Sequence, residues 1–244
     1  LIRPIAVLQK VFGRPGGGYT TRDDQGDNIS RENPFYGELT GIYWVWKNTD
    51  FAPDDIVGFG HYNKAISISK KVAQKWLKTN PSGFITIKPS QIRNHPIEKE
   101  AIAMITGVKR SGIKYSEAWD KLYNPDASAK YDCCRGGNMF ITTAEQFQKY
   151  CDWLFPILAF MRSEIGDKLD SSPYWKRYCA YAGERLLSVY IEANSLPVKS
   201  CNVKYKKWWL PICRKIIQAF HLSKNSLFYK KLKRRFGYSS QYKI

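Results

Sequence analysis

Short apolar segments alternate with amphipathic helical segments along most of this chain. The strand-like segments are residues 56–59, 84–87 and 137–141, and the helical segments are residues 33–48, 97–105, 116–123, 143–165 and 182–193. Strands that alternate with helices predict an α/β domain with a mainly parallel sheet. Because ligands bind beyond the carboxyl ends of the strands in such sheets, Gly60-His61-Tyr62 is expected to lie near a site.

The positive charge is concentrated towards the C-terminal end. The formal net charge is +18, and residues 204–244 contain 12 Lys or Arg and no acidic residue, which leaves 18 − 12 = +6 for the first 203 residues. We therefore expect a folded domain over residues 1–200 and a basic amphipathic tail over residues 201–244. Its Trp208-Trp209 pair and interleaved Lys and Arg are typical of a helix at an anionic membrane surface. RNA binding and packing of the tail on its own domain are the alternatives.

The spacing of the cysteines and of the acidic residues indicates which cofactors and which cellular compartment suit this chain. The six cysteines form no C-x-x-C pair and no Cys/His cluster with zinc spacing, which favours reduced thiols in the cytoplasm. No apolar run approaches the roughly 20 residues of a spanning helix. The chain has no D-x-D motif, and Asp54-Asp55 precedes a strand instead of ending one. We predict no metal site, with a divalent metal left as an open alternative.

Two regions carry candidate binding groups. The loop 22–30, R-D-D-Q-G-D-N-I-S, places Asp27 and Asn28 where they would grip a ribose or a uracil edge, or form an Asx-turn that caps a helix. His61 and Lys64 follow a strand, where they would contact a diphosphate, or be a structural histidine and a solvated lysine.

Glu184 and Arg185 follow Gly183 at the expected start of the last helix. At that position Glu184 would serve as a general base and Arg185 would bind phosphate. The alternative is that Glu184 only complements the positive end of the helix dipole.

Read together, several segments resemble the bacterial exopolysaccharide and O-antigen galactofuranosyltransferase domain, long classed as a domain of unknown function in capsule gene clusters. The resemblance spans roughly residues 1–195. The matching residues are Asp24–Ser30, Asn33, Tyr36, Glu38–Thr40, Tyr43–Asn48, Ile56–Tyr62, Asn138–Ile141, Tyr150-Cys151, Trp153–Leu158 and Gly183–Leu187.

The resemblance implies a GT-A-like fold and an inverting transfer of galactofuranose from UDP to a hydroxyl of a lipid-linked glycan. It makes Glu184 the expected base, with Asp27 as second candidate. His61, Lys64 and Arg185 are expected to steady the departing UDP. The full set of expected substrate-binding residues is Asp24, Asn28, Asn33, Glu38, Thr40, Lys47, Asn48, His61, Tyr62, Lys64, Asn138 and Arg185. The implied setting is the cytoplasmic face of the cell membrane, with the tail on anionic lipid and no nucleic-acid partner.

Two departures from the family pattern matter. Asn63 and Lys64 stand where the family usually has two arginines, and Lys does not reproduce the bidentate fork of Arg. The family's opening strand, with a His and a Lys, is absent upstream of Pro4, so we expect a chain incomplete at its N-terminus. A non-catalytic glycan-assembly module is the rival interpretation. An RNA-binding protein is a third, and it would bind RNA with a steep salt dependence and would not bind UDP.

Overall fold

The computed structural model describes residues 23–52, 54–61, 64–89, 98–123, 135, 137–167 and 175–205. The chain divides into two units, Leu1–Val203 and Lys204–Ile244, and the description below concerns the first. The Gly-rich loop 13–18, Tyr62 and nearly all of the basic tail lie outside the described residues.

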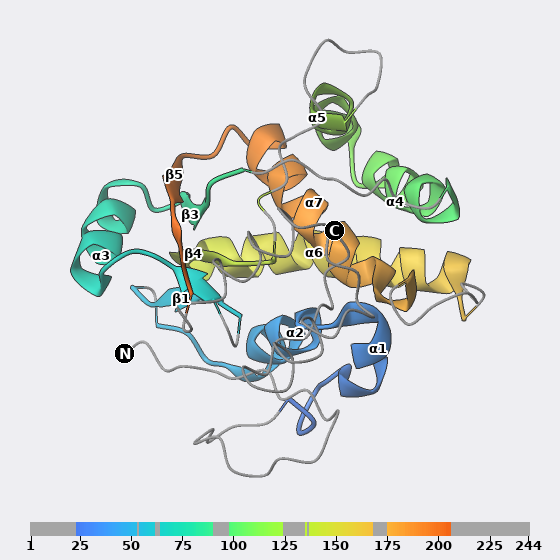
Figure 1. Cartoon of the computed structure of the whole chain (residues 1–244), viewed down its shortest axis with the longest axis horizontal. Helices are drawn as coiled ribbons and strands as arrows, with labels where there is room; N and C mark the ends of the chain where they lie inside the picture. The colour runs from blue at the N-terminus through green and yellow to red at the C-terminus, as the bar shows by residue number, and fades with distance from the viewer. Residues whose placement is uncertain are drawn as a thin grey trace, which may run out of the picture. The chain divides into compact units, whose positions relative to one another are not determined.

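The helices and strands follow one another in the mixed order of an α/β protein (Figure 1). The helical elements are η1 (Ser30–Glu32), α1 (Asn33–Tyr36), α2 (Leu39–Asn48), α3 (Lys70–Thr79), α4 (Glu98–Arg110), α5 (Ile113–Tyr123), α6 (Ala144–Ile165), η2 (Trp175–Arg177) and α7 (Tyr178–Ala193). The strands are β1 (Ile56–Gly58), β2 (Lys64–Ile66), β3 (Phe84–Ile87), β4 (Phe140–Thr143), β5 (Val198–Cys201) and β6 (Val203–Tyr205).

The larger sheet has the strand order β1-β4-β3-β5, and β2 and β6 form a second, two-stranded sheet. Within this larger sheet, strand β4 runs antiparallel to both β1 and β3, and only β3 and β5 pair in parallel. The prediction of a mainly parallel sheet is therefore wrong. Two helices, α4 and α5, connect β3 to β4, whereas a βαβ crossover between parallel strands has one.

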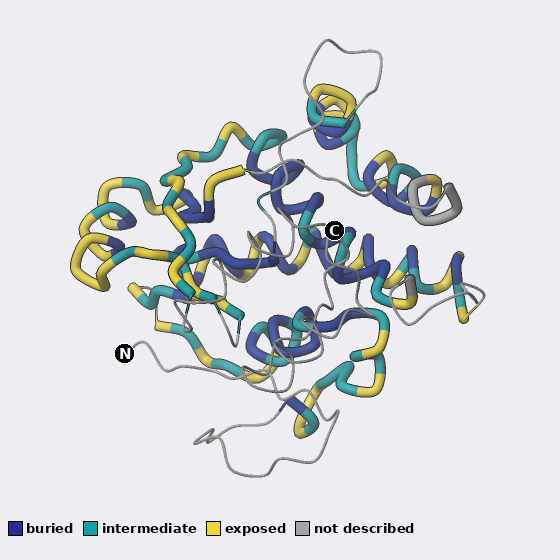
Figure 2. The backbone as a smooth tube through the Cα atoms, in the orientation of Figure 1, coloured by how far each residue is buried: buried dark blue, intermediate teal, exposed yellow. Residues whose placement is uncertain are grey.

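The larger sheet lies between two helical layers (Figures 1 and 2). On one face, Ala73 and Leu77 of α3 pack with Ile85 in a small apolar cluster. On the other face, Phe84 and Phe140 join the main core, which α2, α6 and α7 complete. The alternation of side chains along β3 and β4 explains the division, since neighbouring residues point to opposite faces.

Two helices differ from their predicted bounds. The segment 33–48 is two helices, because the chain turns at Gly37 and Glu38 between α1 and α2. Helix α7 starts at Tyr178, so Gly183 and Glu184 lie well inside it instead of at its start. Gly183 has a packing role: a Cβ there would lie 2.8 Å from Asn138 Oδ1 and 2.9 Å from Leu39 Cδ1.

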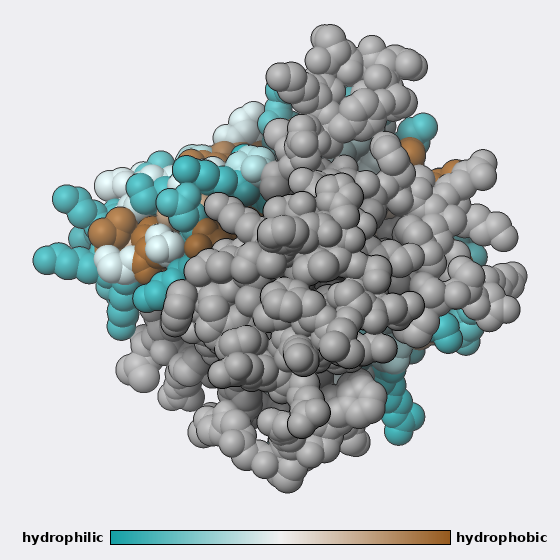
Figure 3. Space-filling model, viewed as in Figure 1, coloured by the Kyte–Doolittle hydropathy of each residue, from teal (hydrophilic) through white to brown (hydrophobic). Residues whose placement is uncertain are grey.

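Helix α6 begins as the sequence predicts, directly after strand β4. The hydroxyl of Thr143 accepts a hydrogen bond from the backbone N–H of Gln146 and caps the helix. Within the described part of the chain, no helix combines the length and apolar character needed to cross a membrane. The side of the molecule on which α3 lies is mostly hydrophilic, with some apolar atoms between (Figure 3).

Candidate active site

The turn between α1 and α2 presents Glu38 at the N-terminal end of α2. Gly37 has a φ of 55°, which glycine adopts without strain, and its carbonyl accepts hydrogen bonds from Asn33 Nδ2 (2.9 Å) and Thr40 Oγ1 (3.1 Å). The Thr40 hydroxyl also lies 2.7 Å from Oδ2 of buried Asp23. Its single proton is donated either to this carboxylate or to the Gly37 carbonyl. Asn33 and Thr40 thus bond within the protein and fix the turn that carries Glu38.

A second turn, Gly137-Asn138, leads into β4. Both residues have positive φ, 84° and 48°, and Gly and Asn are the residues that tolerate this conformation best. Asn138 is 3% exposed, and its Nδ2 donates to Glu38 Oε1 at 3.0 Å and to the Ala180 carbonyl at 3.1 Å. Asn138 therefore ties the entrance of β4 to both α2 and α7.

His61 and Lys64 face this second turn. The two residues form an antiparallel bridge, with the His61 N–H donating to the Lys64 carbonyl at 3.0 Å. His61 Nε2 donates to the carbonyl of Gly137 and lies 3.8 Å from Glu38 Oε1. A Cβ on Gly137 would lie 2.9 Å from His61 Nε2 and 3.0 Å from Lys64 Nζ, so a side chain would not fit there.

Burial lowers the pKa of His61, and this effect outweighs the opposing charge of Glu38. The ring is therefore neutral at pH 7, with its Nε2 proton directed at the Gly137 carbonyl. This geometry favours the structural interpretation of His61: it holds the Gly137 peptide in place.

Glu184 approaches the same glycine from α7. The backbone N–H of Gly137 donates to its carboxylate, so His61 and Glu184 hold opposite sides of the Gly137-Asn138 turn. Burial, and then the charge of Glu38, raise the pKa of Glu184 from 4.5 to about 7, against the opposing effects of Lys64 and Arg185. Because Glu184 lies inside α7, the helix-dipole interpretation is wrong.

We call this group of side chains the Glu184 cluster, and its members come from five separate parts of the fold. They are Glu38, His61, Lys64, Asn138, Arg177, Glu184 and Arg185. A carboxyl group with a pKa near 7 is able to accept a proton at neutral pH, as a general base requires.

The polar loop at residues 24–30 packs on the other end of α2. The Asn48 side chain exchanges hydrogen bonds with the backbone of Asp27 at 3.1 and 2.7 Å, and Tyr43 donates to Asp27 Oδ1 at 3.1 Å. Asn28 Oδ1 accepts from the Ser30 N–H at 3.2 Å, which is the predicted Asx-turn. Asp24, half-buried, belongs to this loop as well.

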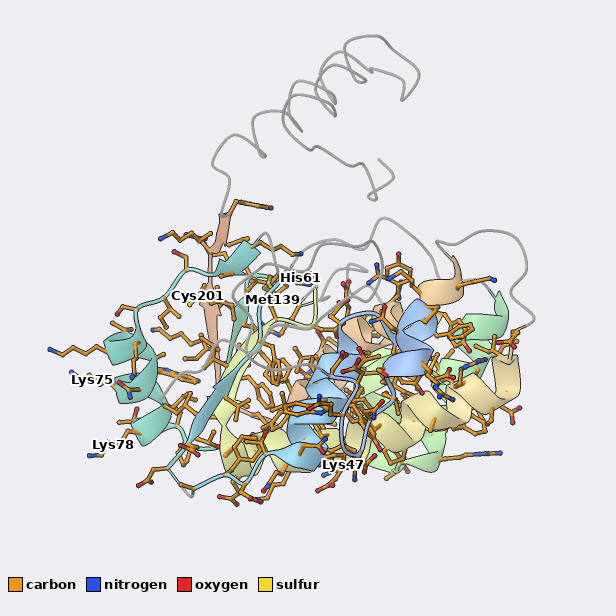
Figure 4. All side chains as sticks on the ribbon, turned by 90° about the horizontal axis from the view of Figure 1, so that it is seen from below. Lys47, His61, Lys75, Lys78, Met139 and Cys201 are labelled. Carbon is orange, nitrogen blue, oxygen red and sulfur yellow. The ribbon has the colours of Figure 1, made fainter. Side chains whose placement is uncertain are left out.

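Ten helical residues separate Glu38 from Asn48, which is about 15 Å along α2. Lys47, near the same end, stacks its ammonium 3.5 Å from the Trp46 ring centre. In Figure 4, Lys47 lies at the lower edge and His61 lies well above it, next to Met139. The structure therefore brings Glu38, His61, Lys64, Asn138, Glu184 and Arg185 together, and it places Asp27, Asn28, Lys47 and Asn48 apart from them.

Two arginines with structural contacts were not predicted from the sequence. Arg177 donates to Glu38 Oε2 at 3.1 Å. Arg135 donates to the hydroxyls of Thr86 (3.1 Å) and Ser200 (3.3 Å), near the carboxyl ends of the parallel strands β3 and β5. Neither lies in a recognisable motif, although the run Gly136-Gly137-Asn138 shortly before a strand signals a close-packed turn.

No group of three or more His, Cys, Asp or Glu residues suited to a metal occurs among the residues the structure describes. A pocket between α3 and the sheet is lined by Asp54, Asp55, Lys70 and Ile141, with further residues of α3 and β1. None of its lining residues belongs to the Glu184 cluster, so we do not assign the pocket to that site.

A solved protein structure resembles this chain in fold and sequence. It is the apo structure of WbbM, a bifunctional glycosyltransferase, with a TM-score of 0.61 and 25% identity over 75% of this chain. The chain spans 39% of the WbbM chain. The fold thus places this protein among glycosyltransferase-related proteins.

The family itself is shown by the sequence. A family model described as "Domain of unknown function (DUF4422)" matches residues 2–195, and the chain belongs to that family. No curated protein sequence matches the chain.

Proposed function

We propose that this protein is an inverting glycosyltransferase that moves a sugar, of the galactofuranose type, from UDP to a hydroxyl of a lipid-linked glycan. The reaction would serve the synthesis of a bacterial capsule, exopolysaccharide or O-antigen. The observation that carries the proposal is Glu184, whose carboxyl group has a pKa of about 7 and interacts with the charges of Lys64 and Arg185, in a family related in fold to a glycosyltransferase.

Glu184 is the proposed base. In an inverting transfer, the acceptor oxygen forms its bond to the anomeric carbon as the bond from that carbon to UDP breaks. The hydroxyl proton passes to the Glu184 carboxylate, and UDP leaves with the bonding electrons. A base with a pKa near the working pH is the most efficient, because it is both ionised and basic enough to take the proton.

Lys64 and Arg185 supply the positive charge that stabilises the departing diphosphate in this proposal. Arg185 is 7% exposed and anchors one Nη to the Tyr181 carbonyl at 3.2 Å, so its guanidinium has a fixed direction. His61 is neutral and holds Gly137, so it contributes position instead of charge. Asp27 is exposed and remote from these groups, which favours Glu184 over Asp27 as the base.

The membrane setting is a separate part of the proposal. We infer that residues 204–244 hold the protein on the anionic cytoplasmic face of the cell membrane, where a lipid-linked acceptor is presented. The support is compositional: 12 Lys or Arg, no acidic residue, and the Trp208-Trp209 pair.

A donor screen tests the proposal. The full chain is incubated with UDP-galactofuranose, UDP-galactopyranose, UDP-glucose and UDP-N-acetylglucosamine, each with and without a lipid-linked acceptor, and free UDP is measured. Acceptor-dependent release from one donor is expected, and calorimetric titration should show UDP binding. Binding of UDP without release from any donor would contradict the enzyme and favour a glycan-assembly binding module. Salt-dependent RNA binding without UDP binding would overturn both.

A further inference from the structure

Glu38 is held by polar side chains from three other parts of the chain. Its Oε1 accepts from Asn138 Nδ2 at 3.0 Å and lies 3.8 Å from His61 Nε2, while its Oε2 accepts from Arg177 Nη2 at 3.1 Å. Both oxygens are thus engaged by the protein, and the side chain is 20% exposed. The protein thus occupies one acceptor site on each oxygen and fixes the direction of the carboxylate.

The partners of Glu38 are the groups that shape the surroundings of Glu184. Asn138 is the second residue of the turn whose first residue, Gly137, donates its N–H to Glu184. His61 holds the carbonyl of the same residue, Gly137. The backbone of Gly37, next to Glu38, is so close to Arg177 that a Cβ would lie 2.4 Å from its Nη2.

The orientation of the Asn138 amide follows from these contacts. Its Nδ2 faces two acceptors, Glu38 Oε1 and the Ala180 carbonyl, so exchanging the amide oxygen and nitrogen would set oxygen against oxygen. The amide oxygen is buried and has no hydrogen-bond partner. Because such an unpaired group is costly, the charge-assisted bond from Asn138 Nδ2 to Glu38 offsets part of that cost and helps to hold the turn.

We propose that Glu38 is a positioning residue: it holds the Gly137-Asn138 turn beneath Glu184 and sets the charge that Glu184 meets, without touching the substrate. The inference rests on the proposed role of Glu184 as base, and it replaces the substrate-binding role that the family resemblance implies for Glu38. The like charge of Glu38 acts in the same direction as burial and makes the Glu184 carboxylate a stronger proton acceptor.

The charges facing Glu184 are balanced across several elements. Glu38, at the start of α2, disfavours the ionised form, while Lys64 of β2, Arg185 of α7 and the Gly137 N–H favour it. His61 is neutral and Arg177 is paired with Glu38. Removing the charge of Glu38 leaves only favourable neighbours, so the proton affinity of Glu184 should fall.

The titration of Glu184 tests this inference and needs no substrate. In full-length protein with ¹³C-labelled Glu, the Glu184 signal is assigned by its loss in Glu184→Gln, and its pKa is measured in wild type, Glu38→Gln and Glu32→Gln. We expect Glu38→Gln to lower the pKa of Glu184 by on the order of one unit. Glu32 is the matched control, because its carboxylate pairs with Arg162 at 2.6 Å and lies outside the cluster. An unchanged pKa in Glu38→Gln, or an equal shift in Glu32→Gln, overturns the inference.

A second variant separates charge from position. Glu38→Asp keeps the negative charge but is one methylene shorter, so it cannot reach Asn138 and Arg177 together. We expect kcat to fall about tenfold or more with KM for the donor nearly unchanged. Full kcat would overturn the positioning role, and a raised KM alone would assign Glu38 to the substrate. Should Glu38→Gln not fold, this variant decides alone; should the wild type release no UDP, the proposed function fails while the titration still decides the inference.

Discussion

Replacing Glu184 with Gln should stabilise the folded protein at alkaline pH relative to wild type. The pKa of Glu184 is about 7 in the folded chain and 4.5 in the ordinary reference state. Because the folded state binds this proton more tightly, the stabilising contribution is complete below pH 4.5 and is lost as the pH rises through 7. With about 1.4 kcal/mol for each pKa unit, the loss between pH 5 and pH 8 is about 2–3 kcal/mol. The amide of the Glu184→Gln variant has no charge to bury and escapes this loss.

The assay is urea unfolding of wild type and Glu184→Gln at pH 5, 6, 7 and 8, followed by circular dichroism. Subtracting the free energy of unfolding of one protein from that of the other cancels the contributions of the groups common to both. The difference should grow in favour of Glu184→Gln by about 2–3 kcal/mol over this range. Glu145→Gln is the control, because the pairing of exposed Glu145 with Lys149 lowers its pKa. A difference between wild type and Glu184→Gln that is flat with pH would refute the raised pKa and with it the argument for the base.

Three further outcomes follow from the structure and composition. Gly183→Ala should destabilise the protein by roughly 1–3 kcal/mol and disturb the titration of Glu184, since the new methyl meets Asn138 and Leu39; Gly107→Ala, whose methyl would lie 2.8 Å from Ile157 Cγ2 in α6, should destabilise without moving that titration. An equal change of the Glu184 titration in both variants would show that Gly183 has no special relation to the site. Deleting residues 204–244 should release the protein from vesicles of anionic lipid, as each basic residue near such a surface contributes about 1 kcal/mol; retention by the vesicles would remove the tail's proposed role. The wild-type rate of UDP release should rise with pH through about 7, because only ionised Glu184 accepts a proton, and a rate that falls over pH 6–8 would contradict this.

Local structure was largely readable from the sequence where residues are buried. Strand β3 has the predicted bounds Phe84–Ile87, and all four residues are buried. Strand β4 runs into α6 with Thr143 as the cap, as the pattern of Thr142, Thr143 and Glu145 indicates. Helix α3 and strand β5 were missed, because α3 buries only Ala73 and Leu77 among many lysines and β5 is only partly buried.

The direction of the strands was not readable from local pattern. The alternation of strands and helices predicts a mainly parallel sheet, but it does not by itself decide the relative direction of two paired strands. Similarly, the pattern of segment 33–48 continues through Gly37, and only the tertiary contacts of that turn show the break at which Glu38 lies.

The candidate site was predicted in part. Glu184, Arg185, His61, Lys64 and Asn138 were named from sequence, and the structure places them with Glu38 in one cluster. The role of Glu38 depends on Arg177, which is 139 residues away along the chain, and no local spacing indicates such a pair. The polar loop around Asp27 was expected at the same site, yet its side chains bond to the opposite end of α2.

The most direct test of the central claim is the rate of UDP release by wild type and Glu184→Gln, measured with the donor and acceptor that the screen identifies. Calorimetry of UDP binding to both proteins accompanies it. The account predicts that Glu184→Gln binds UDP nearly as tightly as wild type and releases it from the donor about 10²–10⁴-fold more slowly. Wild-type turnover by a folded Glu184→Gln protein would contradict the account, because the proton of the acceptor would then pass to another group.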